Sequence, residues 1–129
     1  MKTKIIFSIC LLIAFSLMTG FMYIKSTEVK HIVIFKYKEK TTPAQIEEVT
    51  QAFKALKGKI PGIVSFEYGV NNSPENLNKG FTHAYLLTFK DVASRDAYLP
   101  HPEHNKFGEL LGRLDVLEEP FVVDFQLTE

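Results

Sequence analysis

The part of this sequence that can fold into a domain contains no cysteine. The only cysteine among the 129 residues, Cys10, lies inside an uncharged N-terminal run. The rest of the chain can therefore form no disulfide, and it offers no thiolate for catalysis, for a cysteine-based zinc site or for an iron–sulfur cluster. Packing and association must supply the stability of the domain.

An excess of basic residues is also lacking. The formal net charge is zero, and from Thr27 onward 12 basic residues face 15 acidic ones. Nucleic-acid binding needs a basic surface, so this composition argues against nucleic acid as a partner. The chain has no long run of like charges, no glycine-rich phosphate loop and no Ser/His/Asp signature of a hydrolase.

The N-terminal 26 residues have the pattern of a targeting segment. Lys2 and Lys4 precede an uncharged run over residues 5–24, and Lys25 closes it. This pattern is typical of a secretory signal, and the run is also long enough to cross a bilayer as one helix. Because no clear cleavage site is present, a signal peptide and a membrane anchor both stay open. Either way, we expect residues 27–129 to form one exported domain, periplasmic or secreted, with membrane contact only through the N-terminal segment.

Four segments predict β-strands, namely residues 28–38, 63–70, 81–90 and 114–127, which are rich in β-branched and aromatic residues. Pro120 in the last of them favours an edge position or a bulge. Thr42, Pro43 and Gln45 predict a capped helix start, and Gly58 predicts its end.

A second helical region, residues 91–113, is interrupted by two prolines, which predict a break because each lacks an amide donor. The resulting order is β-α-β-β-α-β. It predicts an α+β, ferredoxin-like fold with a four-stranded antiparallel sheet and its helices on one face.

Such a sheet needs more cover than its own helices can provide. The strands carry apolar side chains on both faces, whereas the helices cover only one, and a large exposed apolar face marks an interaction surface. We therefore predict a homodimer in which two sheets face each other. We expect the dimer core to contain eight aromatic residues: Phe35, Tyr37, Phe66, Tyr68, Tyr85, Phe89, Phe121 and Phe125. A cavity between the sheets would suit a small hydrophobic or aromatic ligand.

Four segments in order resemble the stress-responsive dimeric α/β-barrel (Dabb) family across nearly all of the chain from Val29. They are the opening strand at 29–38, a Gly-Phe-Thr-His motif at 80–83, a Tyr-Leu-Pro-His-Pro-Glu-His turn at 98–104, and the closing strand at 122–125. The resemblance implies a dimeric barrel with its helices outside. One member of the family closes a linear polyketide by aldol condensation without metal or cofactor.

By that resemblance, Tyr98 and His104 correspond to a catalytic pair, and His31, His83 and His101 are expected to contact a ligand. A neutral imidazole can accept a proton near neutral pH, and a tyrosine hydroxyl can polarise a carbonyl. No metal or cofactor is expected.

Structural roles remain open for the same residues. Tyr98 and His104 could shape the turn, His31 and His83 could be hydrogen-bonded core histidines, and His101 could cap a helix. The alternatives to cyclase- or lyase-like chemistry are a non-enzymatic stress-response or interaction protein with a filled barrel core, and a cofactor-free oxygenase.

Overall fold

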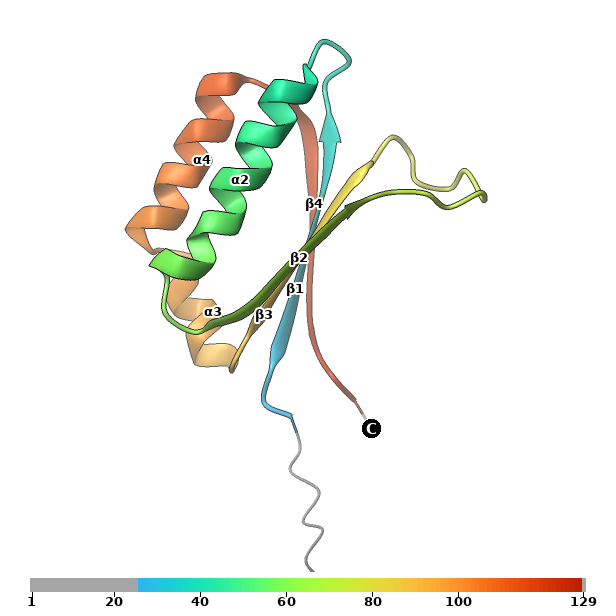
Figure 1. The fold of residues 1–129 in the computed structure, drawn as a ribbon. Coiled ribbons are helices and arrows are strands. Elements are labelled where there is room, and N and C mark those ends of the chain that lie inside the picture. Colours follow the sequence, from blue (N-terminus) through green and yellow to red (C-terminus); the bar gives the residue numbers. More distant parts are fainter. Residues whose placement is uncertain (1–25, 129) are drawn as a thin grey trace, which may run out of the picture.

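The computed structural model describes residues 26–128, which form four strands and three helices (Figure 1). In chain order these are β1 (Val29–Tyr37), α2 (Pro43–Lys59), β2 (Ile63–Val70), β3 (His83–Phe89), α3 (Val92–Tyr98), α4 (Pro102–Leu114) and β4 (Leu117–Gln126). The strands pair antiparallel in the order β2-β3-β1-β4, and the helices lie on one side of the sheet (Figure 1). The predicted ferredoxin-like fold is confirmed.

Local signals in the sequence set most of the helix and strand ends. The Thr42 side chain accepts from the Gln45 amide while the Gln45 side chain accepts from the Thr42 amide, which is the predicted capping box. The end of α2 was predicted wrongly at Gly58, because the helix continues to Lys59 and Ile60 follows it in extended conformation. Pro120 lies on β4, an edge strand, close to a register shift between Lys36 and Tyr37.

The helix-covered face of the sheet carries the core. His31, Val33 and Phe35 alternate along β1 and pair across to Leu87, Tyr85 and His83 of β3, so all of these side chains point towards the helices. Phe53 of α2 stacks against Phe35 and Phe107 at centroid distances of 6.1 and 4.6 Å. The core on this side therefore combines aromatic rings with aliphatic side chains such as Val49, Leu56 and Leu87.

No helix within residues 26–128 covers the opposite face of the sheet (Figure 1). We call it the open face, and its apolar residues are Ile32, Ile34, Ala84, Leu86, Phe121, Val123 and Phe125. The expectation that eight aromatic residues form the dimer core is therefore wrong for six of them. The register of the strands turns all except Phe121 and Phe125 towards the helices, since side chains two positions apart share a face.

Candidate functional site

Tyr98 and His104 meet at the break between α3 and α4. Tyr98 ends α3 and is only 1% exposed, and His104 lies in the first turn of α4. Their ring centroids are 4.3 Å apart. Pro100 and Pro102 interrupt the helix between them, so the chain bends and the two rings approach each other instead of following one helical face.

One hydrogen bond fixes how His104 presents its ring. Its Nδ1 lies 2.9 Å from the carbonyl oxygen of Leu99. Because a carbonyl can only accept, Nδ1 must carry the proton, and Nε2 of the neutral ring is left as an acceptor. The helix break thus holds this imidazole in the tautomer that a general base requires.

The Tyr98 hydroxyl is suited to donate a hydrogen bond. Burial, and then the negative charge of Asp124, raise the pKa of Tyr98 above its ordinary value. The phenol therefore keeps its proton at neutral pH and can offer it to a ligand oxygen. Among the described residues its hydroxyl has no hydrogen-bond partner. The hydroxyl is also not completely enclosed, because no fully buried side-chain oxygen or nitrogen of these residues lacks a partner.

His31 approaches the same tyrosine from β1. It is 5% exposed, and its ring centroid lies 5.7 Å from that of Tyr98. His31 and Asp124 are directly opposite each other on β1 and β4, and Nδ1 of His31 lies 2.5 Å from Oδ1 of Asp124. The other oxygen of Asp124 accepts from the guanidinium of Arg95 on α3. A carboxylate bonded to Nδ1 orients the ring and leaves its Nε2 for another partner.

A hollow of about 230 Å³ joins these groups between the sheet and helices α3 and α4. We call it the helix-side hollow, and it is lined by His31, Val33, Phe35, Phe53, Tyr98, Leu99, His104, Phe107, Gly108, Leu111, Pro120 and Val122. The predicted site residues His31, Tyr98 and His104 thus lie inside one chain. They do not face the space between two sheets, where the sequence analysis had located the cavity. The reason is again strand register, which turns His31 to the helix side.

The other two predicted histidines lie outside this hollow. His83 pairs with Phe35, four residues along β1 from His31, and contacts the ring of Tyr37 at 5.0 Å. Burial lowers the pKa of His83. His101 is the N-cap of α4, and its Nδ1 accepts from the Glu103 amide at 3.2 Å. The capping role considered for His101 is therefore confirmed, and neither residue reaches Tyr98.

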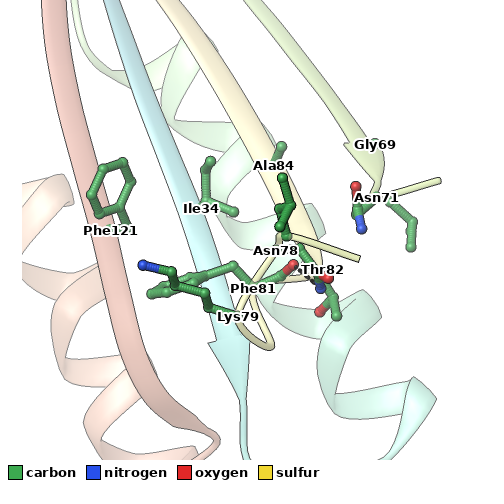
Figure 2. A pocket seen from close by; sticks show the side chains of 11 residues that line it. Ile34, Gly69, Asn71, Asn78, Lys79, Phe81, Thr82, Ala84 and Phe121 are labelled. Carbon is green, nitrogen blue, oxygen red and sulfur yellow. Dashed lines mark hydrogen bonds between the residues drawn. The ribbon is translucent and has the colours of Figure 1, made fainter. Parts of the chain in front are cut away.

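A larger hollow of about 530 Å³ lies on the open face, under the loop between β2 and β3 (Figure 2). Ile34, Ala84 and Phe121 form its floor, and Phe81 contacts Phe121 at 6.0 Å. Its lining contains no histidine and no carboxylate. It therefore offers mostly apolar surface, and Lys79 is the one charged side chain in its lining.

Within residues 26–128, no three His, Cys, Asp or Glu side chains come together as a metal-binding group. In the same range no helix is long and apolar enough to cross a bilayer. The predicted signal or anchor lies in residues 1–26, almost all of it outside the described part.

Asp124 and Arg95 belong to the site but were not predicted from the sequence. The sequence could have pointed to Asp124, because a carboxylate in the apolar segment Val122–Phe125 needs a partner when it faces the interior. Arg95 gave no comparable signal. Arg95 lies one turn before Tyr98 on α3, and it joins the site only because the fold brings Asp124 of β4 next to it.

Comparisons with known proteins agree with this fold. Residues 29–127 match the family model described as the Stress responsive A/B Barrel Domain, Dabb. The stress-response A/B barrel domain-containing protein HS1 of Arabidopsis thaliana is 31% identical, over 78% of this chain and 90% of the relative. Olivetolic acid cyclase of Cannabis sativa is 33% identical, over 64% of this chain and 81% of the relative.

Solved structures of similar proteins have the same fold. Hydroxynitrile lyase from Passiflora edulis superimposes with a TM-score of 0.73 at 26% identity, covering 81% of this chain and 96% of the lyase. A dimeric protein with a ferredoxin-like fold from Bacteroides fragilis gives a TM-score of 0.62 at 29% identity, covering 81% of this chain and all of the neighbour. The similar proteins thus include two named enzymes and a dimer.

Proposed function

The chain belongs to the stress-responsive A/B barrel domain (Dabb) family, and from that premise we propose that it binds a small, uncharged carbonyl compound in the helix-side hollow and removes a proton beside the carbonyl without a cofactor. The observation that carries the proposal is the contact of Tyr98 with His104, in which one ring offers a hydrogen and the other a free lone pair. Relatives named as a cyclase and a lyase support the choice of reaction class.

The hollow limits the size and polarity of the ligand. A volume of about 230 Å³ equals the share of about eight water molecules at ~30 Å³ each. The lining is mostly aliphatic and aromatic, and its polar groups are two imidazoles and one phenol. This chemistry favours a monocyclic aldehyde or ketone over a carboxylate, because no cation lines the hollow to pair with an anion.

The proposed step balances without any further reactant. The Tyr98 hydroxyl donates a hydrogen bond to the carbonyl oxygen, and Nε2 of His104 takes a proton from the carbon next to the carbonyl. The electrons of that C–H bond form an enolate, whose charge the Tyr98 hydrogen bond stabilises. The enolate carbon then either takes the proton back from the His104 imidazolium or attacks a second carbonyl of the same ligand, whose new alkoxide oxygen takes that proton. In both cases His104 returns to its neutral form.

Hydrogen exchange into a ketone tests this step directly. Acetophenone is incubated with the protein in D₂O, and the loss of its methyl proton signal is followed by NMR. We expect wild type to exchange acetophenone protons faster than buffer alone. In His104→Gln the rate enhancement over buffer should fall at least about a hundredfold, because general-base catalysis contributes a rate factor of roughly 10²–10⁴. Tyr98→Phe should also lose exchange, since it removes only the hydroxyl.

Tyr37→Phe is the matched control for Tyr98→Phe. Its hydroxyl bonds to that of Tyr85 at 3.1 Å, outside the helix-side hollow, so this variant should exchange acetophenone as wild type does. Equal exchange in wild type, Tyr98→Phe and His104→Gln would remove the proposed chemistry. Binding of acetophenone without exchange would leave a non-enzymatic binding protein.

We also propose that the domain works as a homodimer and outside the cytoplasmic membrane. Dimeric neighbours with the same fold and the uncovered open face support the first part. The apolar N-terminal run supports the second. Cell fractionation tests export: the domain should be found in the culture medium or the periplasm, or be degraded by protease added to spheroplasts, and its recovery only inside spheroplasts that resist the protease would contradict the proposal.

A further inference from the structure

Arg95 does not line the helix-side hollow, but Asp124 and His31 connect it to that hollow. Its guanidinium sits on α3, bonds Asp96 at 2.8 Å through Nε and contacts Asp124 through Nη1. Asp124 in turn holds Nδ1 of His31 at 2.5 Å. A guanidinium, a carboxylate and an imidazole therefore form one chain that starts at the surface and ends at the ring facing Tyr98.

The charge on the His31 ring is what matters to a ligand in the hollow, and it depends on Asp124 and Arg95. A carboxylate bonded to an imidazole stabilises the imidazolium, and this would leave His31 without a free lone pair. A guanidinium on the other oxygen of the same carboxylate cancels that attraction, because it stays charged at every relevant pH. Hydrogen bonds to Asp96 and then to Asp124 raise the pKa of Arg95 further.

We propose that Arg95 is a positioning residue: it neutralises Asp124, so that His31 stays uncharged, donates Nδ1–H to Asp124 and presents Nε2 to the hollow. The consequence for ligand recognition rests on the proposed function. The state of the His31 ring does not, because it can be measured with no ligand present.

The charged and titratable groups around His31 come from three elements. Arg95, Asp96 and Tyr98 lie on α3, His104 on α4 and Asp124 on β4. From β3, Leu87 and Phe89 contribute only apolar contacts. Removing the charge of Arg95 or that of Asp124 should therefore shift the His31 proton equilibrium in opposite directions.

The test is a long-range ¹⁵N–¹H NMR spectrum of the histidine rings in the full chain at pH 7, with the His31 signals assigned from His31→Gln. In wild type, Nδ1 should show the shift of a protonated nitrogen and Nε2 that of an unprotonated one. In Arg95→Gln the doubly protonated share of His31 should rise, with its ratio to the singly protonated form increasing about threefold, the effect of one unit charge roughly 7 Å away through a water-like dielectric. In Asp124→Asn it should fall below the wild-type share.

Two further variants separate charge from structure. Arg95→Lys keeps the charge and should restore most of the wild-type ring state. Arg113→Gln is the matched control, because Arg113 pairs with Glu48 at 3.6 Å on α2, away from the site. A His31 ring state that is the same in wild type, Arg95→Gln and Arg113→Gln overturns the proposal. If Arg95→Gln does not fold, an unchanged or higher protonated share in Asp124→Asn overturns it instead.

Acetophenone exchange then separates this inference from the proposed function. A changed ring state in Arg95→Gln supports the role of Arg95 even if wild type exchanges nothing. An unchanged ring state contradicts that role even if exchange depends on Tyr98 and His104.

Discussion

A single acidic residue on the open face should dissociate the dimer while leaving the chain folded. Val123 projects from this face, opposite Ile32 on β1, and is 40% exposed in the single chain. In Val123→Asp the new carboxylate still reaches water in the monomer, so the free energy of unfolding of the monomer should change by no more than about 0.5 kcal/mol.

In the dimer the same substitution counts twice. A two-fold symmetric interface uses the same patch on both copies, so each dimer would bury two carboxylates without partners. Each unpaired buried charge costs about 3 kcal/mol, so the free energy of dimerisation becomes about 6 kcal/mol less favourable. The dissociation constant of the dimer therefore rises about 10⁴-fold. A nanomolar dimer would become monomeric at micromolar concentration.

Sedimentation equilibrium of residues 27–129 measures this change, and Val122→Asp is the matched control. Val122 directly precedes Val123 on β4 and is 52% exposed, but it pairs with Val33 on the helix-covered face. Its variant should remain dimeric. A wild type that sediments as a stable monomer, or two aspartate variants that both associate as wild type does, would contradict a dimer formed through the open face.

Substitutions at three other positions test the fold and its response to pH. Thr42→Ala removes both hydrogen bonds of the capping box and should lower the free energy of unfolding by about 1 kcal/mol in urea titrations followed by circular dichroism; no loss would mean that the cap contributes nothing. Phe53→Ala empties the centre of the aromatic core and should cost about 3–5 kcal/mol, against less for Phe53→Leu; equal losses would contradict the packing. Burial lowers the pKa of His83 below its ordinary 6.5, so between these values the folded state binds fewer protons than the unfolded state. Stability should therefore fall as the pH drops through about 6.5, and His83→Gln should have a flatter Tm profile from pH 5 to 7.5. An identical profile in wild type and His83→Gln would rule out this source of pH dependence.

The fold followed from the sequence because its signals are local. Strand alternation, the Thr42–Gln45 cap and the proline pair each act within a few residues, and together they determine the order of the elements. Gly58 misled the prediction because a helix ends where its backbone bonds end, and the amide of Ile60 still reaches the carbonyl of Leu56.

The site followed only in part, because it depends on which face a strand presents. Tyr98 and His104 are six residues apart and could be paired from the chain break alone. Placing His31 with them required the β1–β4 register, which sets His31 opposite Asp124 across 93 residues of sequence. The same register turned most of the aromatic residues towards the helices, away from the expected dimer core.

The pairing of Val29 with Gln126 also brings the two ends of the domain together, since Gln126 bonds the Thr27 carbonyl at 3.2 Å, far from the loop between β2 and β3 (Figure 1). A circular permutant with a short turn joining β4 to β1, and with new termini opened inside residues 71–80, would keep every strand pairing. In that rearranged order β3, α3, α4, β4 and β1 become contiguous. Tyr98, His104 and the linked charges of Arg95 and Asp124 behind His31 would then lie in one uninterrupted segment, with α2 and β2 appended after it.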